Sequence, residues 1–260
     1  MSGVGVTLLS TAAVTVVAVL VTFAIARWRG RYDTIDTFWG LGFALVSLVA
    51  FELPGGGSVA LRIVVTALTV LWGVRLAVHL QLRNRRLPED PRYAEMVRRA
   101  GSRPGRRIFV RVYLVQAVVL WFVSLPVQLA QYGTGFGVAA WFGVALWAIG
   151  FTFEAIGDEQ LRRFKADPEN RGKVLRHGLW RYTRHPNYFG DACVWWGLYL
   201  LACSTPLGAA TVLSAAAMTF LLAKGTGKPL LEKGMEKTRP GYRDYVERTS
   251  GFFPLPPRKV

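Results

Sequence analysis

Seven apolar segments alternate with polar ones along the chain, and their lengths predict membrane-spanning helices. Residues 4–26 carry no charge and exceed the roughly 20 residues that a helix needs to cross a bilayer. No Lys or Arg precedes this segment, and it is too long for the apolar part of a signal peptide, so we expect a retained helix. The seven segments are 4–26, 37–53, 59–82, 112–132, 136–153, 192–204 and 207–223. They predict an all-α integral membrane protein with about seven transmembrane helices, of which the sixth is short for a full crossing.

The basic residues lie almost entirely at one end of these segments. The links 27–31, 83–111, 162–184 and 224–259 hold all of the 32 Lys and Arg residues except Arg62 and Arg75. The positive-inside rule then places the N-terminus outside and the C-terminus in the cytoplasm, as seven crossings also require. The net charge of +16 therefore indicates membrane topology and contact with membrane lipids, and we expect no nucleic-acid partner. The preference for Arg over Lys and the abundance of Ala, Val and Gly are typical of a GC-rich bacterial genome, and we expect the chain in the bacterial inner membrane.

Several common site types are excluded by spacing. Cys193 and Cys203 lie ten residues, or about 15 Å, apart on one predicted helix, too far for a disulfide within it. No Cys/His set has zinc spacing, so we expect no metal site. The run 224–228 lacks the order of a phosphate loop, and no Gly-x-Gly-x-x-Gly opens a strand–helix unit. We expect one membrane-embedded domain, 1–260, with substrate-side helices in 1–132 and a cofactor-binding half in 133–260. Its oligomeric state stays open.

The densest polar stretch is 178–191, directly before an uncharged apolar segment. Pro186 restricts the residue before it and is typical of a fixed turn that enters a helix. Such a cluster can bind an anionic, planar ligand beside a lipid-soluble one. The alternative is a basic loop with interfacial Tyr and Trp, as in many membrane proteins. The candidate residues are Arg181, Tyr182, Arg184, His185, Asn187, Tyr188 and Asp191.

The fifth apolar segment runs without a break into a polar helix that Asp167-Pro168 ends. On this helix Glu154, Asp158, Arg162 and Lys165 fall at i, i+4, i+8 and i+11, which places them on one face. The stripe is either a solvated face with i,i+4 ion pairs, or a surface that follows a ligand from ribose hydroxyls at the acids to phosphates at the cations. Lys173 then leads toward the central cluster.

Two further candidates lie in the N-terminal half. Asp36 stands at the edge of the second apolar segment, where a helix cap or an interfacial position explains it and a role in polarising a substrate is the alternative. Tyr93 follows Asp90, Pro91 and Arg92 in a turn that looks fixed.

The central run resembles a superfamily of integral membrane enzymes that includes steroid 5α-reductases, sterol reductases and isoprenylcysteine carboxyl methyltransferases. It is closest to a bacterial branch related to the 5α-reductase C-terminal domain, and the resemblance covers nearly the whole chain. The residues that carry it are Arg181 to Asp191, Asp33, Asp36, Trp39-Gly40, Trp72 to Leu76, Glu89 to Tyr93, Glu232, Pro240-Gly241-Tyr242, Tyr245 and Phe253-Pro254.

The resemblance to the reductases implies NADPH among the last helices and a lipid substrate that enters from the bilayer. It implies cofactor contacts at Glu154, Asp158, Arg162, Lys165, Lys173, Tyr182, Asn187 and Asp191, to which we add Arg181, Arg184, His185, Tyr188 and Tyr242. The methyltransferases instead imply S-adenosylmethionine, held by the same His-Pro turn.

We therefore expect an oxidoreductase that reduces a conjugated carbon–carbon double bond in a steroid, sterol, isoprenoid or fatty-acyl-like lipid. Asp36 and Tyr93 are the candidate catalytic residues, since a donor must stabilise the substrate oxygen as hydride arrives. The tail after residue 224 is expected to form a cytoplasmic helix and a lid. The alternatives are a lipid methyltransferase and a non-enzymatic lipid-binding protein.

Overall fold

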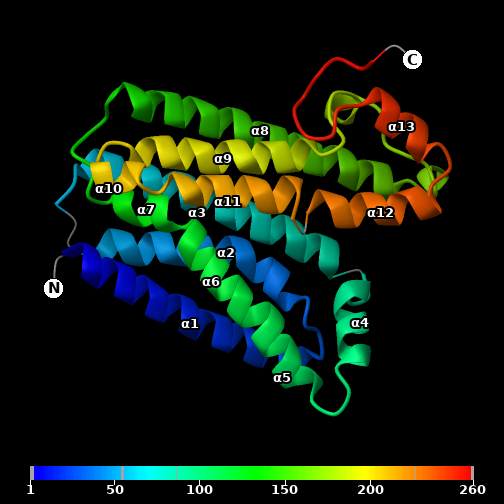
Figure 1. The fold of residues 1–260 in the computed structure, drawn as a ribbon, viewed down its shortest axis with the longest axis horizontal. Helices are drawn as coiled ribbons and strands as arrows, with labels where there is room; N and C mark the ends of the chain where they lie inside the picture. Colours follow the sequence, from blue (N-terminus) through cyan, green and yellow to red (C-terminus); the bar gives the residue numbers. More distant parts are fainter. Residues whose placement is uncertain (1–2, 54–55, 86, 226, 259–260) are drawn as a thin grey trace. The chain divides into compact units, whose positions relative to one another are not determined.

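The computed structural model describes residues 3–53, 56–85, 87–225 and 227–258, and every regular element in these ranges is a helix (Figure 1). The helices are α1 (Gly3–Arg29), α2 (Thr34–Glu52), α3 (Val59–Asn84), α4 (Pro91–Arg99), α5 (Pro104–Ile108), η1 (Phe109–Tyr113), α6 (Leu114–Val123), α7 (Leu125–Ala130), α8 (Val138–Ala166), η2 (Pro168–Asn170), η3 (Gly178–Arg181), α9 (Pro186–Ala202), α10 (Pro206–Ala209), α11 (Val212–Ala223), α12 (Lys228–Thr238) and α13 (Tyr242–Arg248). The prediction of an all-α protein is confirmed. Pro54, Gly55 and Thr226, which fall in links of the sequence analysis, lie outside the described residues.

Six helical stretches of the described chain are long and apolar enough to cross a membrane. They are Gly3–Arg29, Thr34–Glu52, Val59–Asn84, Pro104–Ala130, Val138–Ala166 and Pro206–Ala223. The expected sixth of seven crossings, α9, has 17 residues and is not among them. At 1.5 Å per residue it is about 26 Å long, against a hydrocarbon core of about 30 Å. Termini on opposite sides require an odd number of crossings, so the predicted orientation depends on α9 and stays a prediction.

The chain divides into two compact units, Met1–Gly137 with Leu201–Ser214 and Val138–Leu200 with Ala215–Val260. In the first unit α2 lies between α1 and α3 (Figure 1). A Cβ atom on Gly40 would collide with the carbonyl oxygen of Gly73, and one on Gly73 with that of Gly40. These two glycines therefore let α2 and α3 approach to backbone contact.

A polar seam joins α1 to the α6–α7 region of the same unit. Thr11 donates to the Oε1 atom of Gln128 at 2.6 Å, and Thr7 and Tyr132 share a hydrogen bond of 2.6 Å between their hydroxyls. Trp121 donates to the Thr11 hydroxyl at 3.2 Å. Within a bilayer such groups need partners inside the protein, because no water reaches them. The seam therefore aligns the first helix with a helix more than 100 residues away.

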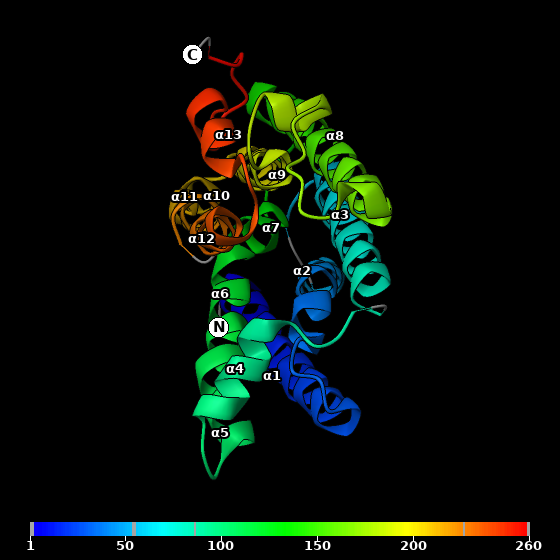
Figure 2. The same ribbon diagram turned by 90° about the vertical axis from the view of Figure 1, so that its right-hand side faces the viewer.

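In the second unit α9 lies between α8 and α11 in both views (Figures 1 and 2). A Cβ atom on Gly190 would lie 2.5 Å from the backbone nitrogen of Glu154, and one on Gly197 would lie 2.6 Å from the carbonyl oxygen of Gly143. These glycines are seven residues apart on α9, so they recur on the face that meets α8. On the other side Trp196 donates to Thr219 of α11 at 3.0 Å. The close α8–α9 approach brings the polar end of α8 against the start of α9.

Candidate active site

The two candidate catalytic residues, 57 positions apart in the sequence, meet in the first unit. The Tyr93 hydroxyl donates to the Oδ1 atom of Asp36 at 2.7 Å. Arg92 places its Nη2 atom 3.6 Å from the other carboxylate oxygen of Asp36. Tyr93 is buried, while the Asp36 side chain keeps 21% of its surface exposed. Asp36 is therefore the acceptor of a phenol, which goes beyond the cap and interfacial explanations of its position.

The link before α4 fixes this pair through charged contacts. Asp90 caps α4 by accepting from the backbone nitrogen of Arg92 at 2.9 Å, and its other oxygen pairs with the Arg92 guanidinium at 2.9 Å. The backbone nitrogen of Asp90 donates to Asp33 at 3.3 Å, and Arg31 binds both oxygens of Asp33 at 3.1 and 2.7 Å. Tyr93 lies in the first turn of helix α4, so the predicted loop turn is wrong, but its position is fixed because these bonds tie the start of α4 to the start of α2.

The same contacts set the protonation of the turn. Burial raises the pKa of Tyr93, and the charge of Asp36 raises it further, so the phenol is neutral at physiological pH. Burial would also raise the pKa of Asp90, but the hydrogen bonds from Arg92 outweigh it and hold that pKa below its ordinary value. Tyr93 is thus a hydrogen-bond donor over the whole neutral range.

A second polar group lies between α8 and the start of α9 in the second unit. Glu154 and Asp158 are 3% and 6% exposed, and Asn187 donates to the Oδ1 atom of Asp158 at 3.1 Å. Asp191, one turn after Asn187, is 8% exposed. Gly157 permits this contact, since a Cβ atom there would lie 3.1 Å from the ring of Pro186. Four of the cofactor candidates therefore share the α8–α9 interface, and the turn into α9 at Pro186 is confirmed.

The rest of the stripe on α8 lies on the surface. Arg162 is exposed and binds both oxygens of Glu159, at 2.6 and 2.7 Å. Arg163 shares the same carboxylate at 2.6 Å, and Lys165 is exposed. The ligand-following stripe thus divides after Asp158, and the solvated alternative describes its outer half. The continuous helix to Ala166 and its end at Asp167-Pro168 are confirmed.

Arg184 and His185 bind a carboxylate of the tail. Glu232 of α12 accepts from the Nε atom of Arg184 at 2.8 Å and lies 2.9 Å from the Nε2 atom of His185. Arg184 also donates to the carbonyl oxygens of Val246 and Thr249 at 3.1 and 2.7 Å. The residue is only 9% exposed and His185 only 2%. Most of the Arg184 donors are therefore used inside the protein, which gives this residue a structural role that sequence reasoning did not find.

The protonation of this cluster follows from burial and from its partners. Burial lowers the pKa of His185 despite the nearby carboxylate, so its ring is neutral at pH 7 and its Nε2–H donates to Glu232. Burial alone would raise the pKa of Glu232, but the bonds from His185 and Arg184 lower it to about 2. The cluster therefore contains an ionised acid, a neutral imidazole and a buried guanidinium.

The residues after α13 bind the central run along its backbone. Thr183 and Ser250 form a parallel bridge. The backbone nitrogen of Arg184 donates to the carbonyl oxygen of Ser250 at 2.9 Å, and the backbone nitrogen of Leu255 donates to the carbonyl oxygen of Tyr182 at 3.0 Å. The Tyr245 hydroxyl donates to the carbonyl oxygen of Trp180 at 2.5 Å. The prediction of a helical tail is confirmed, and the tail covers the central run.

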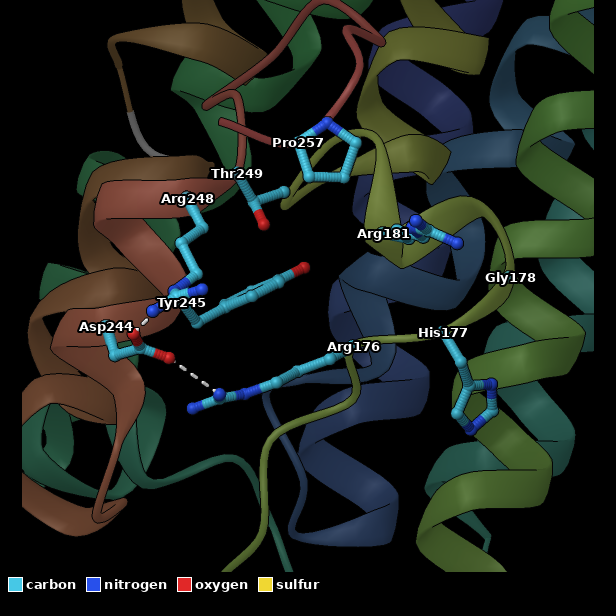
Figure 3. A pocket seen from close by; sticks show the side chains of 9 residues that line it. All are labelled: Arg176, His177, Gly178, Arg181, Asp244, Tyr245, Arg248, Thr249 and Pro257. Carbon is cyan, nitrogen blue, oxygen red and sulfur yellow. Dashed lines mark hydrogen bonds and ion pairs between the residues drawn. The ribbon is translucent and has the colours of Figure 1, made fainter. Parts of the chain in front are cut away.

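A cavity of about 420 Å³ opens where the tail meets the loop before the central run (Figure 3). Asp244 accepts from Arg176 at 2.8 Å and from Arg248 at 2.7 Å, which holds two guanidinium groups on one side. Arg181 also lines the cavity and pairs with no acid of the described chain. The lining consists of Arg176, His177, Gly178, Arg181, Asp244, Tyr245, Arg248, Thr249 and Pro257. Three cations against one carboxylate favour an anionic guest.

The remaining cofactor candidates are scattered over the second unit. Lys173 and Tyr182 are exposed, and Tyr188 stacks on His185 with ring centroids 5.3 Å apart. Tyr242 is 2% exposed, its hydroxyl has no hydrogen-bond partner in the described chain, and burial raises its pKa to about 12. A buried hydroxyl without a partner is costly, so Tyr242 is suited to meet a ligand. No group of three or more His, Cys, Asp or Glu in the described ranges is arranged to hold a metal ion.

Comparisons with known proteins address the family. The profile described as "Protein of unknown function (DUF1295)" matches residues 22–249, which is most of the chain. This chain belongs to the DUF1295 family. An uncharacterized protein of Schizosaccharomyces pombe, C594.04c, is 23% identical over 264 residues, covering 90% of this chain and 76% of that protein. No solved structure matches the chain significantly.

A shorter match points to an enzyme class. The mouse 3-oxo-5-alpha-steroid 4-dehydrogenase 1 is 36% identical over 62 residues, and the bovine protein of the same name is 40% identical over 60. These matches cover 24% and 23% of this chain, and the same shares of those proteins. They support the proposed superfamily and hint at an oxidoreductase. The bacterial branch stays a prediction.

Proposed function

We propose that this DUF1295 protein is a membrane-bound, NADPH-dependent reductase of a conjugated carbon–carbon double bond in a lipid. The contact between Tyr93 and Asp36 carries the proposal, since it joins a neutral phenol and a carboxyl group at the edge of a membrane helix. The partial identity to 3-oxo-5-alpha-steroid 4-dehydrogenases supports the reaction class. Lipids with an enone, such as steroids, sterols, isoprenoids or fatty-acyl-like molecules, are the substrate class.

The chemistry of the pair follows from where charge develops. When hydride reaches the β-carbon of an enone, negative charge accumulates on the carbonyl oxygen. In the structure Tyr93 donates to Asp36, and a bound carbonyl would compete for the same hydroxyl proton. Because the pKa of Tyr93 is raised, its role is to stabilise the enolate oxygen as a hydrogen-bond donor, and water then protonates the α-carbon. Arg92 keeps a positive charge near Asp36 when the phenol turns away.

The second unit has donors and acceptors that fit a dinucleotide. Glu154 and Asp158 can accept from ribose hydroxyls, and Tyr242 has a buried hydroxyl without a partner in the described chain. The cavity beside Arg181 can take a phosphate, since guanidinium groups bind phosphate oxygens strongly. NADPH, when bound, would supply the hydride. The chain's own residues would bind and orient it.

Ligand-induced stabilisation tests the cofactor. The protein purified in detergent is heated with NADPH, with NADH or with S-adenosylmethionine. Binding to the folded state raises the free energy of unfolding by about 2.7 kcal/mol at a hundredfold excess of ligand over Kd, and the unfolding temperature rises with it. Stabilisation by NADPH above NADH is expected. A response to S-adenosylmethionine alone would select a methyltransferase, and a response to no ligand would favour a non-enzymatic lipid-binding protein.

Turnover tests the catalytic pair. Tyr93→Phe retains the ring and removes the hydroxyl, so the rate of NADPH oxidation with an enone lipid should fall about 10²- to 10³-fold, as for the loss of one oxyanion donor. NADPH affinity should stay unchanged. Tyr113→Phe is the matched control, because Tyr113 is a buried tyrosine of the same unit whose hydroxyl donates to the carbonyl oxygen of Tyr32. Equal activity of both variants would remove Tyr93 from the reaction.

A further inference from the structure

A second cavity, of about 390 Å³, lies in the first unit at the start of the helical stretch Pro104–Ala130. Four of its seven lining residues are arginines, and none is an acid. Arg107 donates to the carbonyl oxygen of Arg99 at 3.3 Å, and no carboxylate of the described chain pairs with any of the four. The lining is Ala100, Ser102, Arg103, Arg106, Arg107, Val110 and Arg111. The cavity is therefore strongly cationic and contains no internal counter-charge.

The spacing of these residues places like charges beside one another. Arg107 on α5 and Arg111 on the π-helix η1 stand four residues apart, and Arg103 directly precedes α5, so like charges that repel one another lie close together on this stretch. On α8, by contrast, Arg162 and Arg163 share the carboxylate of Glu159. An anion in the cavity would relieve this repulsion, so the arrangement favours a bound anionic group.

An exposed apolar stripe continues from the cavity along the same helical stretch. Val110 lines the cavity and is 49% exposed, and Leu114 and Val118 follow at steps of four with 37% and 67% exposed. Residues at this spacing lie on one face of a helix. The stripe belongs to a stretch that is long and apolar enough to cross a membrane. A cationic cavity thus opens onto a lipid-facing surface at one end of a predicted membrane helix.

We propose that this cavity binds the headgroup of an anionic phospholipid, with an acyl chain along Val110, Leu114 and Val118. A phosphodiester supplies the counter-charge that the four arginines lack, and only an amphiphile also covers the apolar stripe. The lining contains neither residue of the catalytic pair and none of the cofactor candidates, so the proposal does not depend on the proposed reductase activity. The lipid is a resident ligand of the first unit.

The affinity of this site is measured by titrating a fluorescent phosphatidylglycerol into the protein in nonionic detergent micelles. The double variant Arg106→Gln/Arg107→Gln should weaken binding about thirtyfold, which corresponds to about 2 kcal/mol for two arginines beside an anionic group. The matched control is Arg83→Gln/Arg85→Gln, which removes the same charge from the same link outside the cavity. It should bind the lipid within about twofold of the wild type, because salt screens the attraction between the headgroup and charges outside the cavity.

Other ligands and a charge-retaining variant separate the contribution of the headgroup charge from that of the acyl chain. Phosphatidylcholine, which has no net charge, should bind at least about tenfold more weakly, and glycerol 3-phosphate should compete poorly because it cannot cover the stripe. Arg106→Lys/Arg107→Lys retains the charge and should recover most of the affinity, which also shows that the region folds. Equal weakening by the control double variant, or equal binding of phosphatidylcholine, would overturn the site. Tight binding of glycerol 3-phosphate would overturn the acyl-chain part and leave a free-phosphate site.

Discussion

Replacing Glu232 by Ala should detach the tail from the central run. The Glu232 side chain is 17% exposed, and it is the carboxylate that pairs with the buried Arg184 and accepts from His185. Removing one partner of a buried ion pair costs about 3–5 kcal/mol, since the other charge stays buried without compensation. Arg184 would keep its bonds to Val246 and Thr249, so the lower end of that range applies.

The pKa of Glu232 gives a similar magnitude. A pKa of about 2 in the folded protein, against an ordinary 4.5, corresponds to at most roughly 3 kcal/mol of stabilisation of the ionised form, since solvent at this partly exposed site screens the charges. For a protein of this size, a loss of about 3 kcal/mol lowers the unfolding temperature by about 6–12 °C. Glu232→Gln should cost less than Glu232→Ala, because the amide oxygen still accepts one of the two hydrogen bonds.

Thermal unfolding in detergent, followed by tryptophan fluorescence, measures the difference. Glu236→Ala is the matched control, since Glu236 is an exposed acid one turn later on the same helix. Limited proteolysis adds a local readout, because a detached tail should be cleaved within α12 and α13 well below the unfolding temperature. If Glu232→Ala and Glu236→Ala unfold at the same temperature and resist protease equally, Glu232 does not bind the tail to the central run.

Three further results are expected. First, stability should fall on acidification below about pH 6.5, because His185 has a lower pKa in the folded chain than in the unfolded one. It should fall again below about pH 4.5, because the pKa of Glu232 is also lower in the folded chain. A melting temperature that is flat from about pH 7 to 4 would contradict these shifts. Second, Gly190→Ala should cost about 1–3 kcal/mol, because its Cβ would meet backbone atoms of α8, while Gly234→Ala in open space on α12 should stabilise by about 0.5–1 kcal/mol; equal melting temperatures would refute the close packing. Third, a double-mutant cycle of Thr11→Val and Gln128→Leu should show a coupling of about 0.6 kcal/mol, and strict additivity would show that their hydrogen bond contributes nothing.

The fold could be predicted from the sequence where periodicity and length decide it. The helices, the unbroken passage of α8 into its polar end and the helix start at Pro186 follow from apolar runs and from proline chemistry. The number of crossings is less certain, because α9 is intermediate in length between a buried helix and a span. Helix length depends on flanking polar residues, whose placement hydropathy alone does not determine.

The candidate site could be predicted in part. Asp36 and Tyr93, which the sequence marks in two separate segments, form a hydrogen bond, and Asp158 and Asn187 form another. The role of Arg184 was not predicted, because a buried guanidinium and a ligand-binding one look alike until the partner is known. That partner, Glu232, belongs to a tail motif 48 residues later, and single-sequence spacing does not report such long-range pairs.

The docking of the tail has a consequence for how the protein is made. Ribosomes synthesise Arg184 dozens of residues before Glu232 and the carbonyl groups of Val246 and Thr249 that complete its surroundings. Until translation reaches them, this guanidinium must stay hydrated, which keeps the loop before α9 in water during membrane insertion. A truncated nascent chain would therefore keep a hydrated arginine that the finished chain buries.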